Sequence, residues 1–135
     1  MNKEAFKIIN PSSLYNPTSN AYSHVAVVQN FKNIIHVAGQ GGENSKGELS
    51  PNFEEQVIQA INNIQHALKA ANAELSNIAV LRVLVVDHSD EKHQILIKIM
   101  QNLWKNHPFP ACTLIPVPRL ALEHMLIEVE ATAYT

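Results

Sequence analysis

Apolar residues recur along the chain in patterns that divide it into short elements. Helical spacing follows Asn52, which forms a capping-box pattern with Glu55, and predicts an amphipathic helix over Asn52–Ala71. Ser89 is a favourable N-cap for a second helix, and Pro108 marks its end. The inner face of this second helix is formed by Ile95, Leu96, Ile99, Met100 and Leu103. The pattern therefore predicts two helices with one apolar face each.

Strand patterns fill much of the remaining sequence. They cover Phe6–Ile9, Ser23–Val28, Asn33–Ala38, Ile78–Val86, Thr113–Ile115 and Leu126–Ala133. The short segment Gln29–Lys32 between the second and third strands suits a hairpin. Pro116 and Pro118 should end the fifth strand early. The predicted order is therefore β-β-β-α-β-α-β-β, an α+β fold.

The strand Ile78–Val86 is apolar on both of its alternating faces, apart from Arg82. Two helices in a short chain cover only one face of a sheet. The other face therefore needs a second chain, which predicts an oligomer. An unpaired charge at Arg82 would be costly, so this side chain either reaches an acid across the interface or faces a polar central channel.

The composition indicates the size of the domain and its location in the cell. The chain has 135 residues, 46% of them apolar, which is enough for the core of a single domain over residues 1–135. No apolar run approaches the roughly 20 residues that cross a bilayer, and the N-terminus lacks the pattern of a secretory signal. We therefore expect a cytoplasmic protein with no membrane partner. The one cysteine, Cys112, cannot form an intrachain disulfide.

Charge and histidine spacing limit the partners further. Lys and Arg number 10 and Asp and Glu number 12, a net charge of -2, and the basic residues are scattered singly. Nucleic-acid binding needs clustered cations, so we expect no nucleic-acid partner. The 7 histidines include no metal-binding spacing such as His-Glu-x-x-His. We therefore expect no metal.

Three glycines follow the third strand, in the segment Ala38–Gly42. Gly39, Gly41 and Gly42 invite a phosphate-loop interpretation, but the Lys-Ser/Thr of a P-loop and the spacing of a dinucleotide fingerprint are both missing. Glycines after a strand more often allow a positive φ or a close backbone approach. That second interpretation is favoured here.

Several separated motifs resemble the YjgF/RidA family, also called endoribonuclease L-PSP-like. Such proteins carry Phe-Pro-Ala-Arg, a Leu-Pro turn and a closing Val/Ile-Glu-Ile-Glu-Ala strand; the corresponding segments here are Phe109–Cys112, Arg119–Ala121 and Ile127–Ala131. The family's Ser-Gly-Gln is similar to Ala38–Gln40, and its Gln-Ala-x-x-Asn-Ile run to Gln59–Ile64. Their order and spacing together cover nearly the whole chain.

This resemblance implies a fold and an activity. The fold would be RidA/chorismate-mutase-like, a mixed sheet with two helices on one face, in a homotrimer around a central barrel of sheets. Small pockets would lie in the clefts between subunits. Deaminating members hydrolyse reactive enamines or imines derived from amino acids to 2-oxo acids and ammonia, with no metal or organic cofactor.

The resemblance also names candidate site residues. Glu128 matches the family acid and would be the catalytic group that positions a water. Substrate-binding candidates are Tyr22, Ala38, Gly39 and Cys112. Two of these depart from the family pattern, because Ala38 replaces the serine and Cys112 replaces the arginine that holds the substrate carboxylate. A neutral thiol supplies neither the charge nor the two hydrogen bonds of a guanidinium group.

Two functions remain open at this point. The first is a binding protein whose pocket, lacking the arginine, takes a neutral or differently charged small metabolite. The second is a divergent cofactor-free deaminase or hydrolase that uses Glu128 and a water on a substrate without a carboxylate. If Glu128 has no catalytic role, it is an ordinary solvated carboxylate on a strand. Cys112 becomes a reactive thiol only where a helix N-terminus or a cation lowers its pKa. Arg119 is either a substitute for the missing arginine or a surface ion-pair residue.

Overall fold

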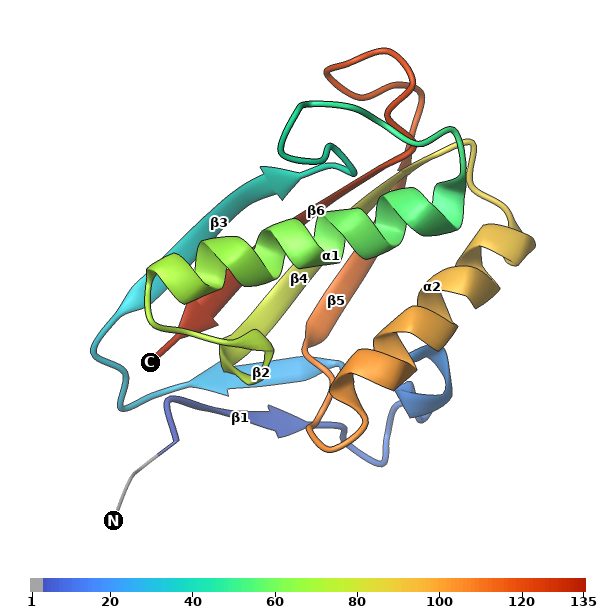
Figure 1. Cartoon of the computed structure of the whole chain (residues 1–135). Coiled ribbons are helices and arrows are strands. Elements are labelled where there is room, and N and C mark those ends of the chain that lie inside the picture. The colour runs from blue at the N-terminus through green and yellow to red at the C-terminus, as the bar shows by residue number, and fades with distance from the viewer. Residues whose placement is uncertain (1–3) are drawn as a thin grey trace.

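Two helices pack on one face of a four-stranded sheet in the computed structural model, which describes residues 4–135 (Figure 1). The predicted order of elements is confirmed. The strands are β1 (Phe6–Ile9), β2 (Val25–Val28), β3 (Ile34–Gln40), β4 (Ile78–Val86), β5 (Ala111–Val117) and β6 (Ile127–Tyr134). The helices are α1 (Phe53–Ala70) and α2 (Asp90–Trp104), with single 3-10 turns at η1 (Thr18–Asn20) and η2 (Leu75–Asn77).

The four-stranded sheet is mixed, as predicted. Its strand order is β3-β6-β4-β5, with β4 and β5 parallel and the other two pairs antiparallel. Strand β3 therefore forms one edge of the sheet and β5 the other. Strand β6, although last in the sequence, lies in the interior between β3 and β4.

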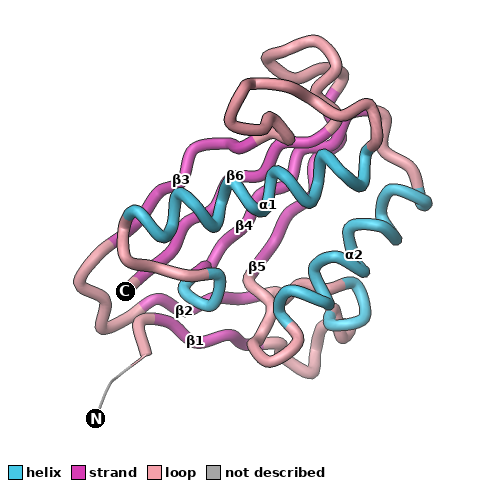
Figure 2. Tube along the Cα trace, viewed as in Figure 1, coloured by secondary structure: helices cyan, strands magenta, loops and turns pink. Residues whose placement is uncertain are grey.

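The predicted hairpin between the second and third strands is wrong. Strand β2 pairs with β1 in a separate two-stranded ribbon, while β3 pairs with β6. The ribbon runs across one end of the larger sheet (Figure 2). On one side of β2 a bridge joins Ser23 to Ala111, and on the other side Asn33 and Thr135 form backbone hydrogen bonds of 3.0 and 3.1 Å. The segment after β2 therefore hydrogen-bonds to the C-terminal end of the chain instead of folding back on β2.

Strand β5 is longer than its prolines predict. It continues through Pro116, which lies opposite Val85, and ends at Val117. A proline lacks the N–H that a central strand needs for pairing on both sides. At Pro116 the edge strand β5 pairs only with β4 among the described residues, so it accommodates this loss.

Side-chain caps define where the helices begin. The Asn52 side chain accepts a hydrogen bond of 2.9 Å from the backbone N–H of Glu55, and the Ser89 hydroxyl accepts one of 3.2 Å from Lys92. Both caps agree with the sequence prediction. Ala71, predicted as the last residue of the apolar face, is instead the exposed C-cap of α1.

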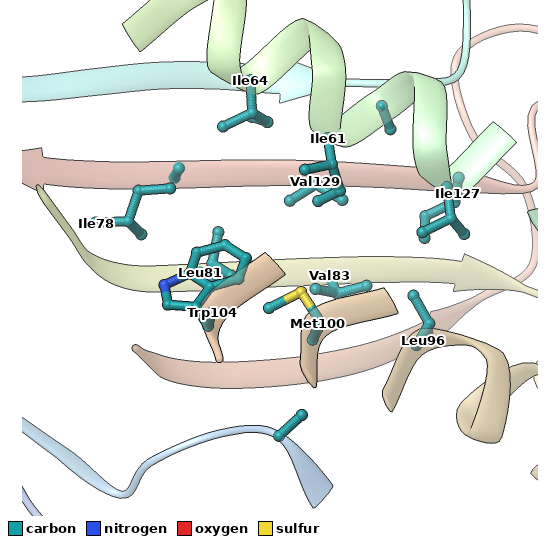
Figure 3. Packing of buried hydrophobic residues seen from close by; sticks show 14 of the residues in the cluster. Ile61, Ile64, Ile78, Leu81, Val83, Leu96, Met100, Trp104, Ile127 and Val129 are labelled. Atoms are coloured by element: carbon teal, nitrogen blue, oxygen red, sulfur yellow. The ribbon is translucent and has the colours of Figure 1, made fainter. Parts of the chain in front are cut away.

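The core lies between the helices and the sheet (Figure 3). Its buried side chains come from both helices and the two central strands: Val57, Ala60, Ile61, Ile64, Leu68, Leu81, Val83, Val85, Leu96, Ile97, Met100, Trp104, Ile127, Val129, Ala131 and Ala133. Alternate residues of β4 and β6 therefore face the helices. The remaining residues of these strands face the opposite side of the sheet, here named the outer face.

The outer face of β4 is uncovered in a single chain. Val80 is 39% exposed, and the neighbouring Arg82 side chain is 55% exposed. Arg82 forms an ion pair with Glu130, its partner on the adjacent strand β6 of the same chain. The arginine therefore has an acid within its own subunit, which differs from the first of the two alternatives, an acid across an interface.

Candidate functional site

Cys112 lies on the helix-facing side of β5. It is opposite Leu81 in the parallel register of β4 and β5, and residues in register point to the same face. Burial raises the pKa of the Cys112 thiol from its ordinary value of 9.0 to about 11. The thiol is therefore neutral at pH 7, and the reactive interpretation, which requires a lowered pKa, loses its electrostatic basis.

The thiol lines an open-sided cavity of about 310 Å³ between α1, α2 and the sheet. Most of the wall is apolar. It is formed by the half-buried Leu114 and by the buried residues Ala21, Val57, Ile61, Leu81, Val83, Leu96, Ile97, Met100 and Val129. Polar side chains in the lining are those of Asn20, Tyr22, His93 and Thr113. The cavity therefore contains no lysine, arginine or carboxylate in its described lining.

Tyr22 lines the same cavity as Cys112. Ala21, just before it, has a left-handed backbone with φ 58°, and the N–H of Ser23 donates a 3.0 Å hydrogen bond to the carbonyl of Pro110. This contact fastens the Tyr22 loop to the residues that precede β5. The structure therefore brings together two of the predicted site residues that are 90 positions apart in the sequence.

Two further aromatic side chains hold Tyr22. Its hydroxyl hydrogen-bonds to the hydroxyl of Tyr15, and its ring lies 5.5 Å from the His24 ring in an edge-to-face arrangement. His24 also hydrogen-bonds through Nε2 to the Tyr15 carbonyl, at 2.8 Å. Sequence reasoning missed Tyr15 and His24, although three aromatic rings within ten residues of one loop are a usable signal.

Glu128 and Gly39 lie together on the other side of the sheet. Glu128 is half-buried between the buried Ile127 and Val129 of β6, so its side chain points to the outer face. A Cβ built on Gly39 would overlap the Glu128 carboxylate. Glycine at position 39 therefore makes room for this acid.

Ala38 lines a separate hollow of about 410 Å³ on the outer face. Its polar lining comes from His36, Arg82, Glu130 and Thr132, and the His36 Nδ1 atom lies 3.3 Å from the Thr132 hydroxyl. The hollow is open to solvent in a single chain and lies on the opposite side of the sheet from the apolar cavity beneath α2.

The five predicted site residues thus form two groups within one chain. Tyr22 and Cys112 line the apolar cavity, whereas Ala38, Gly39 and Glu128 lie on the outer face. Strand β4 lies between β5 and β6, which places those two strands roughly 10 Å apart. A cleft that contains both groups requires a second chain.

The remaining sequence candidates have structural roles. A Cβ at Gly42 would lie 2.7 Å from the Cα of Gln56, so this glycine allows the close backbone approach that was favoured over a phosphate loop. The Arg119 Nε atom donates a 3.2 Å hydrogen bond to the adjacent Leu120 carbonyl, and Arg119 is outside the lining of both cavities described above. Arg119 therefore does not replace the missing arginine within one chain.

Residues 4–135 contain no cluster of three or more His, Cys, Asp or Glu side chains suited to a metal ion. Over the same range, no helix is both long and apolar enough to cross a membrane.

Comparison with known families and structures agrees with this geometry. The family model described as Endoribonuclease L-PSP matches residues 14–135. A crystal structure of the Rid-family protein YyfB from Yersinia pestis, described as of unknown function, has a TM-score of 0.91 and 30% identity, over 97% of this chain and 99% of that one. The chain belongs to the YjgF/Rid family.

Other Rid structures are similar at lower scores. The YjgF gene product of E. coli has a TM-score of 0.66 and 26% identity, over 76% of this chain and 81% of that one. A putative endoribonuclease from Thermotoga maritima shares the fold at a TM-score of 0.68 and 23% identity, over 100% and 98% of the two chains. No sequence among the curated proteins matches the chain. The backbone is therefore more similar to YyfB than to YjgF.

Proposed function

We propose that this Rid protein is a homotrimer that binds a small, uncharged metabolite in the clefts between its subunits. The observation that carries the proposal is the neutral Cys112 thiol, which stands in an apolar wall at the position of the family's carboxylate-binding arginine. A carboxylate there would lose its hydration without gaining a cation. The metabolite is therefore expected to lack a carboxylate at this end.

The arrangement of strands supports a site shared by two subunits. Strands β3 and β5 are the two edges of the sheet, with Gly39 on the first and Cys112 on the second. If the β5 edge of one subunit packs against the outer face of the next, beside its β3 edge, Cys112 and Glu128 line one cleft. This is the pocket that the family resemblance implies.

A second candidate function is the divergent deaminase. Gly39 leaves space for the Glu128 carboxylate. An acid in this position is available to orient a water for attack on an iminium carbon. Its substrate would again be one without a carboxylate.

Ammonia release separates the two functions. The protein is incubated with freshly generated enamines, one group carrying a carboxylate and the other not. We expect both groups to release ammonia no faster than in buffer. Release only from the enamines without a carboxylate, lost in Glu128→Gln, would establish the second candidate. Rapid turnover of the carboxylate-bearing enamines would contradict the central role given to Cys112.

Restoring the arginine tests the same position by gain of function. We expect Cys112→Arg, alone or combined with Ala38→Ser, to bind 2-oxobutyrate at least about tenfold more tightly than wild type, because a guanidinium group adds charge and paired hydrogen bonds. Calorimetric titration measures the affinity. Cys112→Met is the matched control, since it adds length without charge and should gain nothing. No gain in a folded double variant would show that the pocket differs from the family's beyond these two positions.

A further inference from the structure

We propose that the cavity between α2 and the sheet binds a compact, uncharged, mainly apolar molecule about the size of a one- or two-ring aromatic compound. This inference rests on the proposed function, because it names the class of ligand for the part of the site that contains Cys112. It adds that the ligand's apolar end contacts residues of a single subunit.

The size of the cavity sets the size of the ligand. Its volume is about 310 Å³. Small-molecule pockets begin at roughly 300 Å³, and a dry apolar cavity of about 150 Å³ is enough for benzene. The space therefore suits one or two fused rings and is too small for a nucleotide or a peptide.

The walls set its shape and polarity. Buried Leu81, Val83 and Val129 form the side made by the sheet, and Leu96 and Met100 contribute to the side made by α2 (Figure 3). A slot between a sheet and a helix suits a flat molecule. Two sulfur atoms, in Met100 and Cys112, border the cavity, and sulfur packs favourably against aromatic rings. A charged ligand would be desolvated here without a counter-charge.

One side of the cavity is polar and meets solvent. Asn20 and Tyr22 are half-buried lining residues from the loop that precedes β2. The hydrogen bond between the Tyr22 and Tyr15 hydroxyls holds this loop in position. A single polar atom of the ligand is therefore best accommodated at this end, next to the Tyr22 side chain.

The thiol of Cys112 can report whether a ligand occupies the cavity, since it is the only cysteine in the chain and lines the cavity. Alkylation of the wild-type protein by iodoacetamide is followed by mass spectrometry at pH 9, with indole or toluene as the uncharged probe and indole-3-carboxylate as its charged counterpart. We expect indole or toluene to slow alkylation at least about fivefold. The carboxylate should give no protection. If neither uncharged probe protects up to its solubility limit, or if the carboxylate protects equally, the inference is wrong.

A pair of phenylalanine variants tests the location. Cys112→Phe fills the cavity, whereas Ile58→Phe adds the same ring at an exposed position of α1 outside the cavity lining. In calorimetric titrations we expect indole binding to be lost in Cys112→Phe and retained in Ile58→Phe. Undiminished binding in folded Cys112→Phe would contradict the assigned location. If Cys112→Phe does not fold, the protection of the wild-type thiol still decides the matter.

The failures of the two proposals are distinguishable. Protection of Cys112 by indole together with ammonia release from carboxylate-bearing enamines would contradict the proposed function. It would still support the cavity as a binding site for an apolar ligand. A trimer that releases no ammonia and shows no protection would contradict the cavity ligand alone.

Discussion

At the scale of single residues, the environment of Cys112 determines the chemistry of the site. The side chain lies on β5 against the apolar cavity wall, and burial raises its pKa to about 11. A thiolate would have to form without a cation nearby, because the described lining contains no lysine or arginine. The raised pKa therefore keeps the Cys112 thiol protonated at pH 7, which disfavours a role as nucleophile.

The raised pKa of Cys112 predicts a pH profile. We expect the rate of alkylation to keep rising up to about pH 11, where an unperturbed thiol would level off near its ordinary pKa of 9.0. The free energy of unfolding should fall as the pH rises between these two values, because the unfolded thiol ionises first and the folded thiol retains its proton. Mass spectrometry and chemical denaturation measure the two effects.

Cys112→Ser is the control for the stability effect. It should remove the fall in the free energy of unfolding between the ordinary and the raised pKa of the thiol. An alkylation rate that levels off at or below pH 9 would contradict the buried, neutral thiol.

At the scale of elements, one buried polar side chain joins α1 to the loop before β6. Gln56 is fully buried, and its Nε2 atom donates to the carbonyls of Ser50 at 2.6 Å and His124 at 3.0 Å. Its Oε1 atom accepts a 2.9 Å hydrogen bond from the N–H of Leu126. The amide therefore satisfies three backbone groups from two loops and positions the beginning of the strand that carries Glu128.

We predict that Gln56→Leu lowers the free energy of unfolding by roughly 2–4 kcal/mol, because it leaves these backbone groups without partners. Urea denaturation measures the change. Gln65→Leu, at an exposed position of the same helix, is the matched control and should change stability by no more than about 0.5 kcal/mol. Equal effects of the two variants would show that the Gln56 hydrogen bonds contribute little to stability.

At the scale of the whole molecule, the outer face of the sheet is the largest feature that a single chain leaves unexplained. Apolar residues Ile34, Val80 and Ile115 on this face are 49%, 39% and 37% exposed. The ion pair of Arg82 and Glu130 lies among them, so these two charges are already matched within the chain. Such a face is suited to burial against further copies of the same sheet.

We predict that light scattering gives three times the chain mass of 15.0 kDa. Val80→Lys should dissociate the assembly and leave the circular dichroism of the fold unchanged, since it places a charge in the interface and not in the core. Ile58→Lys is the control, because Ile58 is 46% exposed on α1, on the far side of the sheet from Val80. A monodisperse monomer of the wild type at micromolar concentration would contradict both the trimer and the cleft between subunits.

The sequence alone determined the elements, their order and the family. Helix starts were predictable because a cap such as Asn52 or Ser89 acts on a backbone N–H three residues away. The two apolar faces of Ile78–Val86 likewise indicated a central strand. The loss of the family arginine at Cys112 was also visible in the sequence. All of these signals are local, and local signals can be read from neighbouring residues.

The tertiary structure alone decided how strands pair and which candidate residues meet. The segment after β2 joins Asn33 to Thr135, which lies at the other end of the sequence, and no local pattern encodes that pairing. The same holds for the separation of Cys112 from Glu128, because the face and spacing of each depend on β4 lying between β5 and β6. The cavity beneath α2 is likewise invisible in the sequence, since its volume is what remains when side chains from separate elements pack together.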